Sequence, residues 1–159
     1  MTMQYPSFGR SLLYILCAAA IALIIMVVIT SQPIAANADN ITVHEAYERV
    51  KRGEIVLVDI RRPQEWHQSG IASVAKPITM YQPRPAFVAA LKAAMGDASD
   101  KPIALICATG GRTRHLQRQF KQLEGKNIIN VLGGMFGTAR HEGWIKARLP
   151  VEQWQSASD

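Results

Sequence analysis

Three short apolar runs, separated by segments with helical periodicity, constrain the fold of this chain more than any other feature. They occupy residues 54–60, 103–106 and 127–132. Runs of this length without polar alternation are typical of strands buried on both faces, as strands of parallel sheets are. Between and around them we predict helices over residues 43–51, 86–95 and 113–123, one helical turn at 63–68, a weaker strand at 71–75, and a loop and helix within 135–147. The alternation predicts an α/β fold with a central, mainly parallel sheet flanked by helices.

Charged side chains are confined almost entirely to the part of the chain after residue 38. Arg10 is the only earlier one, so residues 39–159 hold 17 of the 18 Lys and Arg and all 12 Asp and Glu, a net charge of +5. About 120 residues are enough for one domain with its own core. We predict that domain over residues 39–155, with a tail at 156–159. Its basic excess is diffuse and lacks interleaved aromatic residues, which argues against nucleic acid and fits a small anionic substrate or simply solubility.

The N-terminal part has a different character. Residues 11–30 are almost purely apolar, and Arg10 precedes them. A positive flank before an apolar core is typical of an export signal, although this run is also long enough to span a bilayer as a helix. Pro33 and the small residues at 36–38 slightly favour cleavage. Residues 1–38 are therefore predicted to be a signal peptide or a transmembrane anchor that contains one hydrophobic helix, which Pro33 ends. Either would place the domain on the periplasmic side, and membrane association would run through residues 11–30.

The apolar run at 103–106 ends in Cys107, which two glycines and a basic segment follow. A thiol at a strand end, before a glycine-bearing loop and a helix N-terminus, faces backbone N–H groups that stabilise a thiolate. The only other cysteine, Cys17, lies in the apolar segment, so Cys107 is the sole thiol of the predicted domain. This excludes a disulfide within the domain and a metal site with two cysteine ligands. The stretch predicts a cysteine-based catalyst.

The loop after Cys107 is predicted to bind the substrate. Its backbone amides can converge on the sulfur from Ala108, Thr109, Gly110, Gly111 and Arg112. The two glycines permit the backbone angles that such an anion-binding nest requires. The Arg112 side chain is expected to bind an anionic donor or the modified sulfur. Arg114 either assists or is a solvated helix residue.

Four blocks of sequence belong together by order and spacing. They are Val58–Trp66, Ser69–Ile71, Cys107–Arg112, and Leu132–Met135 with Trp144. In these blocks the chain resembles single-domain rhodaneses, which are sulfurtransferases, from about Asn40 to Pro150. The resemblance implies a rhodanese-like α/β fold and transfer of sulfane sulfur through a Cys107 persulfide, from thiosulfate or a persulfide to a thiol or cyanide. It implies no cofactor and no metal.

The resemblance also implies supporting roles near the site. Asp59 is expected to fix loops by hydrogen bonds, and Arg61 to lie at the site rim or to pair with Glu65. Met135 is expected to form a wall near the site or, more simply, to pack in the core. Rhodaneses often have arginine directly after the cysteine, and here that residue is Ala108. The sequence therefore leaves the donor open.

Two other functions fit parts of the same pattern. Cysteine phosphatases and arsenate reductases also use a strand, a cysteine loop and a helix, but with arginine six positions after the cysteine. That position is Thr113 here, and the arginine comes one residue earlier. A shorter loop suits a sulfur atom better than a phosphate group. A second alternative is a module that binds a partner or holds sulfur for it without catalysing turnover.

Overall fold

The chain separates into two units, residues 1–36 and 37–159. The structure is a computed structural model that describes residues 14, 16–17, 39–96, 101–124 and 128–155. Apart from Tyr14, Leu16 and Cys17, the predicted apolar N-terminal helix lies outside the described residues, as does the predicted tail. Among the described residues, no helix has the length and apolar character needed to cross a membrane.

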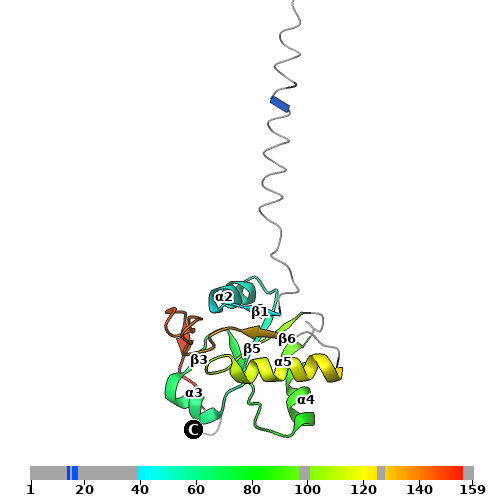
Figure 1. Cartoon of the computed structure of the whole chain (residues 1–159), viewed down its shortest axis with the longest axis vertical. Helices are drawn as coiled ribbons and strands as arrows, with labels where there is room; N and C mark the ends of the chain where they lie inside the picture. The colour runs from blue at the N-terminus through cyan, green and yellow to red at the C-terminus, as the bar shows by residue number, and fades with distance from the viewer. Residues whose placement is uncertain (1–13, 15, 18–38, 97–100, 125–127, 156–159) are drawn as a thin grey trace, which may run out of the picture. The chain divides into compact units, whose positions relative to one another are not determined.

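The predicted alternation of strands and helices is confirmed in the globular unit (Figure 1). The elements are β1 (Asn40–Ile41), α2 (Val43–Lys51), β2 (Val56–Asp59), α3 (Pro63–Ser69), β3 (Ile71–Ala72), β4 (Ala75–Pro77), α4 (Arg84–Met95), β5 (Ile103–Ile106), α5 (Gly111–Glu124), β6 (Ile128–Val131) and β7 (Val151–Glu152). Five strands form one sheet in the order β1-β6-β5-β2-β4. Every pair in this sheet is parallel, as predicted, and β5 lies at its centre.

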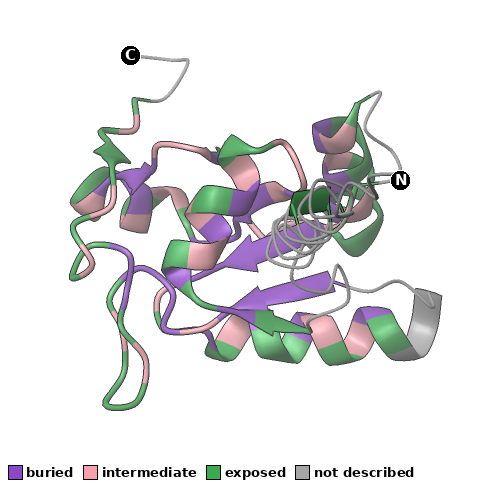
Figure 2. Cartoon of the chain, turned by 90° about the horizontal axis from the view of Figure 1, so that it is seen from above, coloured by how far each residue is buried: buried purple, intermediate pink, exposed green. Residues whose placement is uncertain are grey.

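The central strands are apolar except for Asp59 at the end of β2 and Asn130 in β6, because helices cover both faces of the sheet (Figures 1 and 2). Alternate strand residues belong to two separate core clusters. Leu57 and Ile106 pack on the α2 side with Val43. Val58 and Leu105 belong to the cluster that contains the buried residues of α4 and α5. Two covered faces explain why these strands show no polar alternation.

Local capping explains where two helices begin. At α2, the Thr42 hydroxyl accepts a hydrogen bond from the Glu45 amide at 3.2 Å, as the capping spacing predicts. Helix α3 has Pro63 in its first turn, and the Glu65 carboxylate accepts from the Arg62 amide at 3.1 Å. The predicted single turn is therefore a helix of 7 residues.

Three details differ from the predictions. The weak strand predicted at 71–75 is two strands, β3 and β4, and β3 pairs antiparallel with β7 in a separate two-stranded sheet. Helix α5 begins at Gly111 rather than at Thr113. The helix predicted within 135–147 is wrong, because that segment forms only turns.

The segment 135–147 folds back on itself instead of forming a helix. The Trp144 amide donates to the Gly134 carbonyl at 2.9 Å, and the Ile145 amide to that of Met135 at 3.0 Å. Positive φ angles at Gly133, Gly134 and Gly137 interrupt the helical path. Trp144 is fully buried, and its indole N–H donates to the Pro150 carbonyl at 2.9 Å. Trp144 thereby belongs to the core cluster on the α2 side of the sheet.

Candidate active site

Cys107 directly follows β5, at the centre of the sheet and at the carboxyl ends of its strands. Asp59 ends the neighbouring strand β2, and the turn through Gly134 follows β6 on the other side. The Ile60 amide extends the β2–β5 pairing by donating to the Ile106 carbonyl at 3.0 Å. Open parallel sheets bind ligands in this region, beyond the carboxyl ends of the strands. The fold thus brings together three of the sequence blocks that the analysis singled out.

The Cys107 side chain is only 1% exposed and faces the start of α5. The Gly110 amide donates a hydrogen bond to its Sγ at 3.2 Å, and the Thr113 hydroxyl lies 3.8 Å from the same sulfur. Gly110 has a φ of 89°, which L-residues rarely adopt, whereas Gly111 is an ordinary helical residue. Only the first of the two glycines therefore supplies the backbone freedom that the nest needs.

The surroundings of Cys107 favour its thiolate. Burial raises the pKa of the thiol, but hydrogen bonds from the amides of Thr113, Thr109 and Gly110 and from the Thr113 hydroxyl outweigh it, so the pKa lies below its ordinary value. Of the five loop amides expected to converge on the sulfur, those of Thr109 and Gly110 contribute, and the Thr113 amide adds a donor that was not predicted. A lowered pKa increases the fraction of the thiolate, which is the nucleophilic form of cysteine.

Thr113 and Asn130 form a polar group beneath the loop that sequence reasoning missed. Both are fully buried. The Thr113 hydroxyl lies 3.0 Å from the Gly110 carbonyl and 2.5 Å from Asn130 Oδ1, and Asn130 Nδ2 donates to Asn40 Oδ1 at 2.8 Å. One hydroxyl proton serves two carbonyl oxygens and the sulfur, so they compete for it. An asparagine inside an otherwise apolar strand was the signal that pointed to a buried polar contact.

Arg112 is held on the opposite side of the loop by a carboxylate. Its Nη1 and Nη2 donate to Glu65 Oε2 and Oε1 at 2.7 and 2.6 Å, and Nη1 also lies 3.4 Å from the Tyr81 hydroxyl. Hydrogen bonding to Glu65 is the main cause that raises the Arg112 pKa, and the Cys107 charge raises it slightly further. The same bonds lower the pKa of Glu65. Arg112, the side chain predicted to bind an anionic donor, is therefore already paired with the Glu65 carboxylate.

Asp59 and Arg61 form a fully buried ion pair, with both side chains 0% exposed. The Asp59 carboxylate accepts from the Arg61 amide, from Nε and from Nη2, at 2.8 to 3.0 Å. The guanidinium also reaches the Ser69 hydroxyl at 2.8 Å and the Gly70 carbonyl at 2.6 Å. The expected pairing of Arg61 with the Glu65 carboxylate is wrong, because Arg61 contacts only the carbonyl of Glu65 and sits too deep to form a rim.

The turn after β6 packs directly against the loop backbone. The Met135 amide donates to the Cys107 carbonyl at 2.8 Å, and the Phe136 amide to the Ala108 carbonyl at 2.9 Å. A Cβ on Gly134 would lie 2.3 Å from the Cys107 carbonyl oxygen, so only glycine fits there. The Met135 side chain is buried in the α2-side cluster, away from the cluster that holds Cys107. It supports the site through its backbone, whereas its side chain packs in the core.

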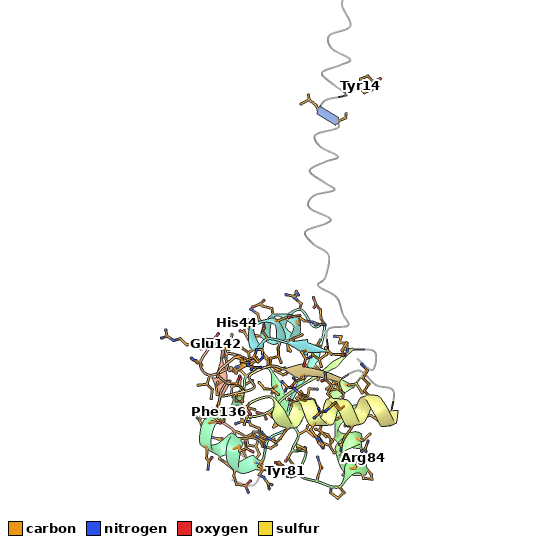
Figure 3. All side chains as sticks on the ribbon, viewed as in Figure 1. Tyr14, His44, Tyr81, Arg84, Phe136 and Glu142 are labelled. Atoms are coloured by element: carbon orange, nitrogen blue, oxygen red, sulfur yellow. The ribbon has the colours of Figure 1, made fainter. Side chains whose placement is uncertain are left out.

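The remaining predicted residues lie at the surface of the loop and helix. Ala108 is half-buried, and Thr109, Gly111 and Arg114 are exposed. Two exposed aromatic side chains flank this region from other segments: Tyr81, which is 46% exposed, and Phe136, which is 50% exposed (Figure 3). Within the described ranges, no group of three or more His, Cys, Asp or Glu residues is arranged to hold a metal ion.

A parallel sheet with a cysteine loop at the end of its central strand is found in the family that comparison with protein-family models identifies. A family model of the rhodanese-like domain matches residues 42–141, which is more than half of the chain. The chain belongs to the rhodanese-like domain family. Membership places it in a family of the sulfurtransferase type.

Solved structures share this fold at low sequence identity. The polysulfide-sulfur transferase homodimer from Wolinella succinogenes is 23% identical with a TM-score of 0.55, over 78% of this chain and 85% of that chain. A protein from M. tuberculosis is 24% identical with a TM-score of 0.52, over 72% and 97%. A Rhodopseudomonas palustris protein, described as a possible tyrosine phosphatase, is 23% identical with a TM-score of 0.51, over 74% and 88%. These likenesses show the fold alone. No curated protein matches the chain in sequence.

Proposed function

We propose that the protein is a sulfurtransferase that moves sulfane sulfur from a small donor to a thiophilic acceptor through a Cys107 persulfide. The supporting observation is the buried Cys107 thiol at the end of β5, with the Gly110 amide 3.2 Å from its sulfur. Backbone donors aimed at the sulfur stabilise negative charge on it both before and after the first transfer.

In the first step the Cys107 thiolate attacks the outer sulfur of the donor. With thiosulfate, a Cys107 S–S bond forms, the bond between the two donor sulfurs breaks, and sulfite leaves with the bonding electron pair. With a persulfide, the same attack forms Cys107–S–SH and releases the donor thiolate. In the second step a thiol or cyanide attacks the outer sulfur of the Cys107 persulfide and the original thiolate returns. No oxidant or reductant is needed, because the sulfane sulfur is transferred without net oxidation.

Cys107 is the only cysteine of the globular unit, because Cys17 lies in residues 1–36. No second thiol of this unit stands ready to attack the persulfide. The intermediate therefore waits for an acceptor from outside the domain, which fits a two-step transfer between two different molecules. The predicted partners are accordingly an anionic sulfur donor and a thiol or cyanide acceptor.

Phosphatase chemistry is the main rival, and the loop geometry argues against it. In phosphatases, the arginine that binds phosphate lies six positions after the cysteine. The residue at that position here is Thr113, which is fully buried under the loop. Arg112, one residue earlier, points to Glu65 rather than into a cup. The arginine that a phosphate cradle requires is therefore absent from position 113, and the guanidinium next to it is paired with Glu65.

Mass spectrometry tests the proposed function directly. Incubation with thiosulfate or an organic persulfide should add the mass of one sulfur atom to the chain, and Cys107→Ser should abolish the addition. Cys17→Ser is the matched control, because it removes the other thiol and should keep the shift. A chain that gains no sulfur from any of several donors would refute the proposal. A shift without turnover to cyanide or small thiols would favour the sulfur-holding module instead.

For residues 1–38 the proposal follows the sequence. This segment would export the domain to the periplasmic side and would either be cleaved near Ala38 or remain as an anchor through residues 11–30. N-terminal sequencing of the protein recovered from cells distinguishes the two. A mature chain that begins near Asp39 indicates cleavage, and one that begins at Met1 in the membrane fraction indicates an anchor.

A further inference from the structure

The Arg112 guanidinium is engaged by a carboxylate in a geometry that neutralises its charge beside the reactive sulfur. The two side chains are paired end to end at 2.6 and 2.7 Å and are only 25% and 24% exposed. Bidentate pairs of this kind are the strong ones, because both nitrogens and both oxygens are satisfied together. An anionic donor arriving at Cys107 therefore meets an arginine whose positive charge is already matched.

Glu65 is not a flexible surface carboxylate that can swing away. It occupies the third position of α3, and its Oε2 also accepts from the Arg62 amide at 3.1 Å, so the helix start fixes it. The Arg62 guanidinium stacks over the Tyr81 ring at 3.5 Å, and the Tyr81 hydroxyl reaches back to Arg112. These four residues make a closed ring of contacts, here called the Glu65 ring. Tyr81 and α3 appear on the lower part of the globular unit in Figure 3.

Counting charges shows what this ring means for the choice of donor. Thiosulfate has two negative charges and the Cys107 thiolate one, so their encounter concentrates three in the site. A protonated persulfide brings none, and an ionised persulfide brings one. Arg112 and Glu65 together contribute zero, so this pair offers the dianion no net positive charge, and the Arg62 guanidinium and the loop amides remain as counterweights. Repulsion between like charges at low dielectric grows with each added charge, so the dianion is penalised most.

We propose that Glu65 is a specificity-determining residue that disfavours the thiosulfate dianion and directs the site toward sulfane sulfur bound to an organic thiol. This inference rests on the proposed sulfurtransferase function and adds the class of donor to it. Glu65 acts through Arg112, which it holds in place and neutralises, and touches no reacting atom. The donor class that follows is a persulfide of a small thiol, a peptide or a protein.

The test is Glu65→Gln in the full chain. Glutamine has nearly the same shape, and its one carbonyl oxygen can take the place of Oε2, which accepts from both the Arg62 amide and Arg112 Nη1. The start of α3 and one contact to Arg112 should therefore persist, while the charge and the contact with Nη2 are lost. Persulfide formation is measured with thiosulfate and with the persulfide of 2-mercaptoethanol. The ratio of kcat/KM for thiosulfate to that for the organic persulfide should rise about tenfold or more, mainly through KM, because an unneutralised guanidinium attracts the dianion. The gain should shrink at high salt.

Two control variants separate local charge from other effects. Glu54→Gln removes one negative charge from another arginine pair, that of Arg52 at the start of β2, remote from the carboxyl ends of the strands where Cys107 lies. It should leave the donor ratio unchanged. Glu65→Asp keeps the charge with a shorter side chain, and the preference against thiosulfate should be retained. A ratio that is the same in Glu65→Gln and the original chain, or an equal change for both donors, would overturn the proposal.

A second readout does not depend on sulfur transfer. Sulfate is a dianion that cannot donate sulfane sulfur, and its binding is read from the protection of Cys107 against alkylation by iodoacetamide. Glu65→Gln should lower the half-protecting concentration of sulfate about tenfold. If no donor forms a persulfide but sulfate protection still improves, the proposed function fails and the charge role of Glu65 stands. If persulfide forms but neither the ratio nor the protection changes, the inference fails and the function stands.

Discussion

Replacing Asp59 by asparagine removes the charge that faces a fully buried arginine and leaves almost the same side-chain shape. Asp59 and Arg61 are both 0% exposed, and three guanidinium contacts at 2.8 to 3.0 Å join them. After the change, Arg61 retains the Ser69 hydroxyl and the carbonyls of Glu65 and Gly70, but none of these has a full negative charge. Breaking a buried pair by removing one partner costs about 3–5 kcal/mol, because the other charge stays buried without compensation.

Urea unfolding of the full chain measures this loss. The three tryptophans, Trp66, Trp144 and Trp154, all lie in the globular unit, so their fluorescence reports on the unfolding of that unit. For a domain of this size the free energy of unfolding falls by about 1–3 kcal/mol per molar urea. A loss of about 4 kcal/mol should therefore lower the urea midpoint by roughly 2 M.

Asp39→Asn is the matched control for this experiment. It makes the same carboxylate-to-amide change in the pair with Lys121, whose side chain is 64% exposed, so its midpoint should hardly move. The double variant Asp59→Asn, Arg61→Met should lose less than the sum of the two single variants, because the uncompensated charge is then absent. A midpoint for Asp59→Asn that matches the Asp39→Asn control would refute the reasoning, since it would mean that the Arg61 charge is not desolvated.

Two further predictions concern the loop itself. The rate of Cys107 alkylation by iodoacetamide should inflect at a lower pH than that of an ordinary thiol, because the Cys107 pKa is lowered. Thr113→Val removes the hydroxyl 3.8 Å from the sulfur and should move the inflection to higher pH. An inflection that does not move would assign the lowered pKa to the amides alone. Gly110→Ala forces a left-handed conformation on an L-residue at φ 89° and should cost about 1–2 kcal/mol in urea unfolding, together with slower persulfide formation. Gly111→Ala, in helical backbone with open space around it, should cause no such loss of stability; equal losses for both would contradict this account.

The sequence by itself determined the fold class and pointed to Cys107 as the candidate reactive residue. Apolar runs with β-branched residues depend only on local composition, and the two covered faces of β2, β5 and β6 follow from them. The cap at Thr42 and the loop after Cys107 are also local signals, set by residues within a few positions of each other. Such signals survive without knowledge of the rest of the chain, because neighbours in sequence must be neighbours in space.

Glycine-rich turns are where local signals failed. The periodicity around Trp144 indicated a helix, but positive φ angles at Gly133, Gly134 and Gly137 made the segment fold back instead. A Cβ at Gly134 has no room because the Cys107 carbonyl lies in its place. That restriction arises from the packing of the turn against the loop, so it could not be predicted from the sequence of residues 135–147 alone.

Only the tertiary structure decided which charges meet. The family resemblance implied that Arg61 lies at the site rim or pairs with Glu65. In the structure Arg61 is instead buried against Asp59, and Glu65 at the start of α3 pairs with Arg112, 47 residues away. The polar contact below the loop likewise joins Thr113 to Asn130 and Asn130 to Asn40, 90 residues apart. Such partners are set by how strands and helices stack, and the free energy of a pair depends on its burial. The sequence therefore singled out Cys107 as the candidate nucleophile, whereas the electrostatic surroundings of this cysteine were decided by the fold.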